Sequence, residues 1–472
     1  MNVALRLLNM TKKFFWLLLS LTIILASCTS SAPAEITPPG NEQAQITLEP
    51  TALPTLTPVP TAYPDKVYVD VGESRGLINP YVYGASYGPW VTVTVEMQPL
   101  AEKSGITYLR FPGGEWGDQN NLSELQIDRF VAYAKKLGAE PKINVRMPGG
   151  TPEQAAELVR YANVENDYNI RYWSIGNEPD LYTAYTMYED FDTKRYNQVW
   201  REFAIAMRDV DEDIILIGPG ISQYTGDPEV DPHDVNGVDW MRAFLLANGD
   251  LVDVVSIHRY PFPENMTGAT QTIADLRENT KEWDEIIPRL RATIRETTGK
   301  DLPIAVSEIN SDWTHATGGE ATTDSFYNAI WWGDVLGRLI TQKVDIVAYF
   351  LLTSPTSGGG YGLLARYEPR PTYFTYQIYQ RFGEELLYSS SDIPYISVYA
   401  ARREDGALTL ILINLADDEK VVPLEIENFS SKNAVEVWRL DPELRAENLG
   451  SEVLGDEVTL PGQSMTLYVL TE

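Results

Sequence analysis

Cysteine and histidine are nearly absent from this chain. Its 472 residues include one cysteine and three histidines. One cysteine cannot form an intrachain disulfide, so the folded state must be held by its hydrophobic cores. Structural and catalytic zinc sites draw on cysteine and histidine, and we therefore expect no metal site. The chain also shows no glycine-rich phosphate loop, because Gly113-Gly114 and Gly149-Gly150 follow expected strands but lack the GxGxxG spacing or a GK(S/T) motif, and we expect no cofactor.

Basic residues are scarce as well. The chain carries 37 Lys and Arg against 67 Asp and Glu, a formal net charge of −30. Nucleic acids and anionic membrane surfaces bind basic surfaces, so we expect neither as a partner. A hydrophobic content of 44% with 11% aromatic residues is typical of a globular protein. This composition suits an enzyme that acts on neutral or weakly charged material, and it leaves the oligomeric state open.

Long hydrophobic runs are missing apart from residues 14–26, which are shorter than the ~20 residues of a transmembrane helix. This run follows a positively charged start and ends in Leu25-Ala26-Ser27-Cys28, as in a secretory signal. The ending resembles a bacterial lipobox, which implies that Cys28 is lipidated. We expect residues 1–28 to be a lipoprotein signal peptide and the protein to be extracytoplasmic, held at the bacterial cell surface or periplasmic membrane face by this anchor alone. The alternative is an ordinary signal peptide that contains a cysteine.

The remaining chain divides into three parts by composition. Residues 29–64 are rich in proline and threonine and are expected to form a semi-rigid linker. Residues 65–385 alternate short apolar runs with amphipathic stretches, whereas residues 386–472 contain only strand-like runs, which predict an antiparallel β-sandwich. The strand expected near residues 66–71 is predicted to join that sandwich.

Eight short apolar runs in residues 65–385 have the character of buried parallel strands. Two of the intervening helices have clear start signals, a possible cap at Ser123 and a capping box at Thr151–Gln154. Eight strand–helix repeats over about 310 residues favour a closed (β/α)8 TIM barrel, an α/β fold, over a doubly wound open sheet. The expected strands are Tyr81–Ser86, Thr107–Phe111, Lys142–Met147, Tyr172–Gly176, Ile214–Gly218, Val252–Ile257, Pro303–Ser307 and Asp345–Leu351.

Two glutamates follow expected strands on roughly opposite sides of this barrel. Glu178 comes after the fourth strand and Glu308 after the seventh, and active sites of such barrels lie at the carboxyl ends of the strands. Cleavage of a glycosidic bond needs two carboxyl groups, one to protonate the leaving oxygen and one to attack the anomeric carbon. Either residue alone could instead be a surface or helix-capping acid, but together they predict a glycosidase.

The motifs around these glutamates resemble a known clan. Asn177-Glu178-Pro179 after the fourth strand, with Glu308 after the seventh, is similar to the clan A, or 4/7 superfamily, of retaining glycoside hydrolases. The segments around residues 109–114, 175–182 and 308–311 resemble families 44, 51 and 79, and family 39 is a further candidate. The resemblance implies that Glu178 is the acid/base, that Glu308 is the nucleophile and that Asn177 bonds the sugar 2-hydroxyl.

Further residues near strand ends are predicted to bind the substrate or to tune the glutamates. A cation helps to keep a nucleophilic carboxylate ionised, and Arg110 is the candidate. The resemblance to the clan implies that His258 or Tyr260 contacts the nucleophile or the sugar, although a structural histidine is the alternative. Where clan members commonly carry a tryptophan after the eighth strand, this chain has Tyr349-Phe350-Leu351-Leu352. The expected substrate-binding residues are Asn177, Arg110, His258, Tyr260, Trp313, Asn310 and Trp116.

The sequence thus predicts a retaining β-glycoside hydrolase that cleaves extracellular poly- or oligosaccharides. Two alternatives remain open. One is a carbohydrate-binding lipoprotein without catalysis on the same scaffold, and the other is an adhesin that recognises partner proteins.

Overall fold

The computed structural model describes residues 63–183, 191–264, 270–354, 359–430 and 434–471. Cys28, the expected signal peptide and nearly all of the expected linker lie outside these described residues. None of the helices in the described ranges has the length and apolar character needed to cross a membrane.

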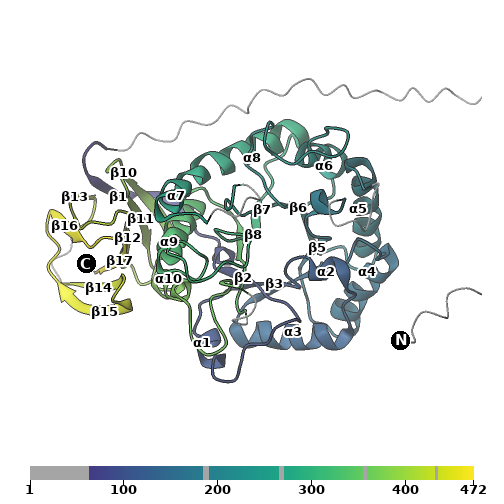
Figure 1. Ribbon diagram of the computed structural model, residues 1–472, viewed down its shortest axis with the longest axis horizontal. Coiled ribbons are helices and arrows are strands. Elements are labelled where there is room, and N and C mark those ends of the chain that lie inside the picture. The colour runs from purple at the N-terminus through teal and green to yellow at the C-terminus, as the bar shows by residue number, and fades with distance from the viewer. Residues whose placement is uncertain (1–62, 184–190, 265–269, 355–358, 431–433, 472) are drawn as a thin grey trace, which may run out of the picture. The chain divides into compact units, whose positions relative to one another are not determined.

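Eight parallel strands close into a barrel in the order in which they occur along the chain. Helices surround the ring of strands (Figure 1), so the strands are buried from both sides and read as continuous apolar runs. The predicted (β/α)8 barrel is confirmed. The barrel strands are β2 (Gly84–Ser86), β3 (Tyr108–Phe111), β4 (Glu140–Val145), β5 (Tyr172–Ile175), β6 (Ile215–Ile221), β7 (Val254–Arg259), β8 (Ile304–Ile309) and β9 (Ile346–Tyr349).

Helices α3 and α4 begin at the capping residues that predict them. Ser123 and Gln126 form the capping box of α3, and Gly138 ends this helix with a φ of 70°, which only glycine adopts without strain. Thr151 and Gln154 form the capping box of α4. The α-helices are α1 (Gln98–Glu102), α2 (Trp116–Gln119), α3 (Glu124–Leu137), α4 (Pro152–Val159), α5 (Thr193–Arg208), α6 (Trp240–Asn248), α7 (Ile273–Asn279), α8 (Trp283–Thr298), α9 (Phe326–Thr341) and α10 (Pro371–Tyr379).

The first barrel strand is shorter than its apolar run. Residues Pro80–Val82 form a 3₁₀ turn, η1, because Pro80 suits the first position of a helix and the Asn79 side chain caps it by accepting from the Tyr81 amide. The remaining short helical turns are η2 (Arg160–Glu165, a π-helix), η3 (Pro179–Leu181) and η4 (Thr280–Glu282).

A curled nine-stranded sheet forms the second part of the fold, as predicted for the C-terminal residues. The first strand of the described chain, β1, belongs to this sheet and pairs antiparallel with β10 and parallel with β13. The sheet curls around its own apolar core, to which Val67, Leu410 and Val437 contribute. Its strands are β1 (Val67–Leu77), β10 (Glu385–Ser391), β11 (Ile396–Arg402), β12 (Leu408–Asn414), β13 (Lys420–Glu427), β14 (Val435–Leu440), β15 (Arg445–Glu452), β16 (Glu457–Leu460) and β17 (Ser464–Leu470).

Helix α9 joins the barrel to the sheet. Thirteen of its sixteen residues are buried, because one face covers the barrel and the other packs against β11, β12 and β17. Gly337 allows the closest approach, since a Cβ atom there would lie 2.3 Å from the ring of Tyr399. The hydroxyl of Tyr399 donates to Asp334 Oδ1 at 2.6 Å, which holds this ring against the helix.

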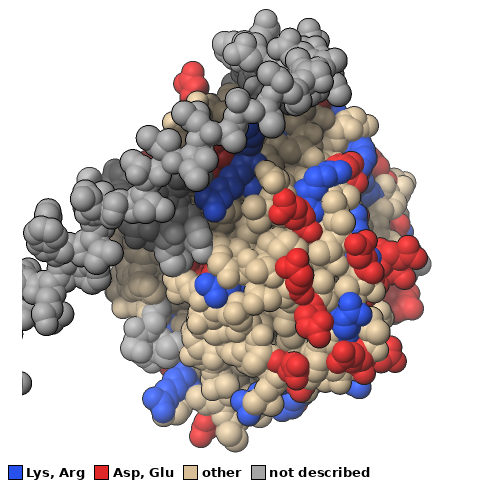
Figure 2. Space-filling view, turned by 90° about the vertical axis from the view of Figure 1, so that its right-hand side faces the viewer, with Lys and Arg blue, Asp and Glu red and all other residues tan. Residues whose placement is uncertain are grey.

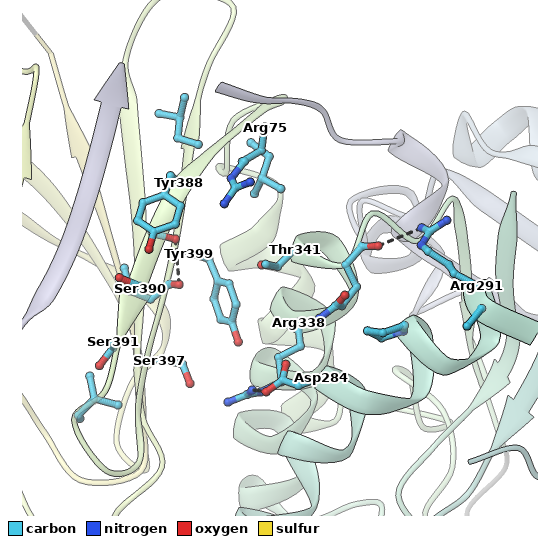
Figure 3. Close-up of a pocket in the computed structure, with 18 of the residues that line it drawn as sticks. Arg75, Asp284, Arg291, Arg338, Thr341, Tyr388, Ser390, Ser391, Ser397 and Tyr399 are labelled. Atoms are coloured by element: carbon cyan, nitrogen blue, oxygen red, sulfur yellow. Dashed lines mark hydrogen bonds and ion pairs between the residues drawn. The ribbon is translucent and has the colours of Figure 1, made fainter. Parts of the chain in front are cut away.

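A crevice of about 470 Å³ lies between α8, α9 and the strands β10 and β11 (Figure 3). Its guanidinium groups already have partners in the protein. Arg338 pairs with Asp284 and Asp334, and Arg291 donates to the carbonyl oxygen of Gln342 at 3.0 Å. These contacts tie α8 to α9 along the barrel side of the crevice.

Acidic and basic side chains lie close together on one face of the molecule (Figure 2). Figure 2 shows the side of the molecule that lies on the right of Figure 1, where red acidic and blue basic side chains are interspersed. Arg201 on α5, for example, pairs with Asp250 at 2.7 Å. Each exposed pair of this kind contributes little to stability. On this face the paired basic residues partly offset the negative charge of their acidic neighbours.

Candidate active site

The carboxyl ends of the barrel strands bring together residues that are far apart in the sequence. Arg110 lies on β3, His258 on β7 and Glu308 on β8, while Asn177 and Glu178 follow β5. His258 and Glu308 are register partners on neighbouring strands, so they stand at the same level of the barrel. Arg110, Asn177, His258 and Glu308 are each at most 5% exposed, which places the group at the bottom of the barrel mouth.

The backbone of Glu178 has a strained conformation. Its φ and ψ are 47° and 60°, in the left-handed region, although a residue before proline prefers extended angles. Such strain costs about 1–3 kcal/mol and persists only where the surroundings hold it. The Glu178 amide donates to the carbonyl oxygen of Gly220 at 3.0 Å, which ties the turn to β6 and turns the side chain toward the barrel mouth.

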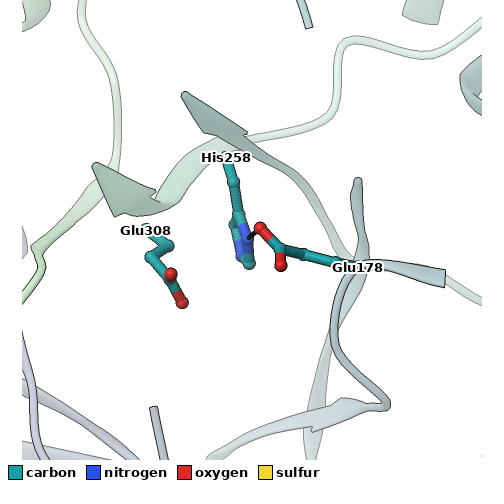
Figure 4. Close-up of side chains that lie close together, drawn as sticks. All are labelled: Glu178, His258 and Glu308. Atoms are coloured by element: carbon teal, nitrogen blue, oxygen red, sulfur yellow. Dashed lines mark hydrogen bonds and ion pairs between the residues drawn. The ribbon is translucent and has the colours of Figure 1, made fainter. Parts of the chain in front are cut away.

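The two glutamates face the same space. Figure 4 shows the carboxylates of Glu178 and Glu308 on either side of His258. One oxygen of each glutamate and one ring nitrogen of His258 lie within 4.8 Å of one another. Retaining glycosidases place their two carboxyl groups ~5–5.5 Å apart, whereas inverting enzymes need ~6.5–9.5 Å to admit a water molecule. The separation therefore fits the retaining geometry.

Both oxygens of Glu308 are occupied by strong donors. Arg110 Nη1 donates to Oε2 in a buried ion pair, and the Tyr260 hydroxyl donates to Oε1 at 2.6 Å. Burial alone would raise the pKa of Glu308, but the charge of Arg110 and these hydrogen bonds outweigh it and hold the pKa below its ordinary value. Glu308 is thus an ionised carboxylate at neutral pH, as a nucleophile must be.

Glu178 has the opposite electrostatic character. Burial and the negative charge of Glu308 raise its pKa to about 8, so the carboxyl group retains its proton at neutral pH. Its Oε1 lies 3.0 Å from Nδ1 of His258, and burial lowers the pKa of this histidine to about 3, so the imidazole is neutral. A protonated carboxylic acid beside an ionised one is the pairing that general acid catalysis requires.

Asn177 connects the two glutamates through Arg110. Its Oδ1 accepts from Arg110 Nη2 at 2.5 Å, and its Nδ2 lies 3.5 Å from Oε2 of Glu178. The predicted residues Arg110, Asn177, Glu178, His258, Tyr260 and Glu308 therefore form one network of contacts.

Glu178, His258 and Glu308 are also the group of described residues that offers three possible metal ligands within one small space. The protein itself already occupies these ligand atoms. Arg110 and Tyr260 bind both oxygens of Glu308, and His258 binds Glu178. The positive charge of Arg110 would further oppose a cation, so the arrangement suits proton transfer better than metal binding.

The two predicted aromatic residues, Trp116 and Trp313, have different neighbours. Trp116 lies beside Trp90 with 6.4 Å between ring centroids, and Trp90 is 41% exposed. Trp313 is equally exposed, and its Nε1 donates to the carbonyl oxygen of Pro263 at 3.3 Å. These rings have free surface on which a sugar can stack.

Phe350 comes directly after β9, the last strand of the barrel. Its ring centroid lies 6.4 Å from that of Tyr260 and 5.5 Å from that of Tyr361. Because Tyr260 binds Glu308, Phe350 belongs to the wall beside Glu308 and supplies an apolar surface there.

The expectation that Asn310 binds substrate is corrected. Asn310 is fully buried, its Nδ2 donates to the carbonyl oxygen of Phe350 at 2.6 Å and its Oδ1 accepts from the Ser311 amide at 2.8 Å. The side chain has no surface left for a sugar, and it instead ties the end of β8 to the end of β9.

Two buried residues of this region are missing from the sequence-based prediction. Lys142 is 1% exposed and donates to Ser174 beneath the site. Burial, followed by the charge of Arg110, lowers its pKa well below the ordinary value. A lysine in an otherwise apolar strand was the available signal. Asp118 on α2 is 3% exposed and accepts from the Asn177 amide at 3.0 Å, and no motif marks it.

Comparison with known proteins agrees with this geometry. The family described as glycosyl hydrolases family 39 matches residues 158–430. A hyaluronoglucuronidase of Hirudo nipponia is 23% identical over 382 residues, which cover 74% of this chain and 71% of that protein. The intracellular exo-alpha-(1->5)-L-arabinofuranosidase 1 of Bacillus subtilis (strain 168) is 22% identical over 424 residues, which cover 72% and 79%. The solved structure of an alpha-L-arabinofuranosidase from Thermotoga maritima superposes with a TM-score of 0.65 at 18% identity, over 86% of this chain and 99% of that chain.

Proposed function

Because this chain belongs to glycosyl hydrolases family 39, and is thus a retaining glycoside hydrolase, we propose that it cleaves β-glycosidic bonds in extracellular poly- or oligosaccharides. The family membership agrees with the predicted clan A. The observation that carries the proposed mechanism is the pair formed by Glu178 and Glu308, whose oxygens lie within 4.8 Å and whose pKa values are shifted in opposite directions.

In the first step Glu308 acts as the nucleophile. Its ionised carboxylate attacks the anomeric carbon while the bond from that carbon to the leaving oxygen breaks. The leaving oxygen takes the proton of Glu178, so an alcohol departs and a glycosyl ester of Glu308 remains. Arg110 and Tyr260 hold the attacking oxygens in place, which saves the entropy of orienting them.

In the second step Glu178, now a carboxylate, takes a proton from a water molecule. The resulting hydroxide attacks the anomeric carbon and releases Glu308 as a carboxylate. Two inversions at one carbon restore its original configuration. Asn177 is proposed to bond the 2-hydroxyl of the sugar through its amide, which already bridges Arg110 and Glu178.

The substrate is proposed to be a carbohydrate held between aromatic surfaces. Trp313, Trp116 and Trp90 have exposed or partly exposed rings, and Phe350 adds an apolar wall. The compared relatives carry names for action on glucuronate-containing and arabinofuranose-containing material, so both kinds of sugar belong in a substrate screen.

We further propose that the enzyme works outside the cytoplasm, anchored by a lipid on Cys28. The lipobox-like ending at Cys28 and the proline- and threonine-rich residues 29–64 support this location. Mass spectrometry of the mature N-terminus tests it, and an unprocessed N-terminus would contradict it.

The proposed activity is tested with a panel of aryl β-xyloside, β-glucoside and β-glucuronide together with aryl α-L-arabinofuranoside. We expect turnover of at least one β-glycoside, with the first-formed sugar detected by NMR in the configuration of the substrate. Release of the opposite anomer would contradict the retaining mechanism, and turnover of the arabinofuranoside alone would contradict the β-specificity.

A further inference from the structure

Asp118 is a buried acid next to the catalytic turn that the proposed mechanism does not use. It lies on the short helix α2, which follows Gly113-Gly114 at the end of β3. Its side chain is 3% exposed. Burying a carboxyl group costs folding free energy unless hydrogen bonds compensate for the lost water. The hydrogen-bond partners of Asp118 therefore indicate what the residue does.

The contacts of Asp118 lead to the turn that carries Glu178. Its Oδ2 accepts from the backbone amide of Asn177 at 3.0 Å, and its carboxyl group also hydrogen-bonds the Tyr182 hydroxyl. Tyr182 OH in turn lies 3.2 Å from the same Asn177 amide. Asp118 and Tyr182 therefore hold the Gly176–Asn177 peptide group, whose amide comes one residue before that of Glu178.

This turn needs such support because Glu178 occupies the left-handed region directly before Pro179. The Gly220 carbonyl holds the Glu178 amide on the side of β6. Asp118 holds the Asn177 amide on the side of β3. The two consecutive amides of the turn are thus fixed by acceptors from two different barrel segments.

The charge state of Asp118 fits a structural acceptor. Burial raises its pKa well above the ordinary value, against hydrogen bonds from Tyr182 and Asn177 that lower it. The Asn177 amide needs only an acceptor oxygen, which a neutral carboxyl group or an asparagine amide supplies equally well. A neutral Asp118 also adds no negative charge beneath Glu178.

We propose that Asp118 is the positioning residue of the acid/base, because it holds the Asn177 peptide so that Glu178 points at the leaving oxygen. This inference rests on the proposed role of Glu178 as the acid. It predicts that loss of Asp118 reproduces the kinetic signature of a misplaced acid although Asp118 does not touch the substrate.

The test compares Asp118→Ala and Asp118→Asn with Asp128→Ala as a matched control. Asp128 also accepts from tyrosine hydroxyls, those of Tyr161 and Tyr168 at 2.8 Å each, but on the outer helices. For each variant kcat/KM is measured on aryl glycosides with poor and with activated leaving groups, and thermal unfolding is followed in parallel.

Asp118→Ala is expected to lose on the order of 10²-fold on poor leaving groups, the effect of a displacement of about 1 Å, and to stay within a few-fold of wild type on activated ones. Asp118→Asn is expected to keep activity on poor leaving groups close to that of wild type, because its amide oxygen can still accept from the Asn177 amide. Asp128→Ala is expected to keep the wild-type ratio of kcat/KM between activated and poor leaving groups. Equal losses on all leaving groups, or wild-type kinetics of a folded Asp118→Ala, would overturn the inference. If Asp118→Ala does not fold, a loss in Asp118→Asn as large as in Glu178→Ala would overturn it as well.

A separate result tests the proposed role of Glu178 on which this inference rests. If Glu178→Ala itself shows no dependence on the leaving group, the assignment of the acid is wrong whatever the Asp118 variants do.

Discussion

The carboxyl groups of Glu178 and Glu308 share one small space, with oxygens within 4.8 Å of each other, and have pKa values displaced in opposite directions. Burial and the charge of Glu308 favour the protonated form of Glu178. Arg110 and Tyr260 outweigh burial at Glu308 and favour its ionised form. At neutral pH the pair therefore holds one proton, which lies on Glu178.

This distribution predicts a bell-shaped dependence of kcat/KM on pH. Activity should fall as the pH rises through about 8, because Glu178 then loses the proton that the leaving oxygen needs. It should fall on the acid side only below the ordinary range of a glutamate, because the pKa of Glu308 is lowered. With an activated leaving group, whose departure needs no proton, the alkaline limb of the measured profile should flatten. An unchanged alkaline limb would argue against Glu178 as its source.

Replacing the nucleophile should abolish catalysis. Glu308→Gln keeps the shape of the side chain but cannot form the glycosyl ester, so turnover should drop on the order of 10⁴-fold or more on every substrate. Added azide should not restore it, because the glutamine fills the space. Glu308→Gly with azide should instead yield a glycosyl azide of inverted configuration, detectable by NMR. Wild-type turnover by Glu308→Gln would show that the nucleophile lies elsewhere.

Removing the acid/base should have an effect that depends on the leaving group. Glu178→Ala is expected to slow the cleavage of substrates with poor leaving groups by about 10²–10⁴-fold and to affect activated aryl glycosides far less. A plot of log kcat/KM against the leaving-group pKa should therefore be steeper for the variant than for wild type. Parallel plots would contradict the role of Glu178.

Tyr260 should tune the nucleophile through its hydrogen bond to Glu308. Tyr260→Phe removes a bond to a charged group, so kcat/KM should fall about 10- to 100-fold. The lost donor no longer lowers the pKa of Glu308, and the acidic limb of the pH profile should move to higher pH. Tyr224→Phe is the control, since that buried hydroxyl contacts Thr293 outside the site and should leave the limb where it is.

A substitution in the contact between α9 and the sheet should lower stability without changing catalysis. Gly337→Ala places a Cβ atom 2.3 Å from the Tyr399 ring, which is held by Asp334 and cannot move aside. The free energy of unfolding should drop by about 1–3 kcal/mol in denaturant titrations, while kcat/KM of the folded variant stays unchanged. In Gly333→Ala, on the same helix, the new Cβ atom approaches the sulfur of the flexible Met465 side chain at 3.1 Å and its other neighbours at an ordinary 3.5 Å or more, so this variant should be nearly neutral.

Much of the fold could be predicted because local signals and tertiary structure agree. The apolar runs became barrel strands, and the caps at Ser123 and Thr151 start helices where predicted. The run at Tyr81–Ser86 is the partial exception, because Pro80 and Asn79 favour a 3₁₀ turn at its start. Asn310 was misjudged for a different reason. It lies in the segment at residues 308–311 whose resemblance to family 79 suggested a site residue, but its hydrogen bonds tie two strand ends together.

The amino-acid order by itself determined that Glu178 and Glu308 end two barrel strands, because strand length and chemistry are local properties of the chain. Only the tertiary structure decided which of the two is protonated. That depends on burial and on the reach of Arg110 and Tyr260 across the barrel. These are distances between segments up to 198 residues apart, and electrostatic energies follow distance and solvent exposure in space, which spacing along the chain does not encode.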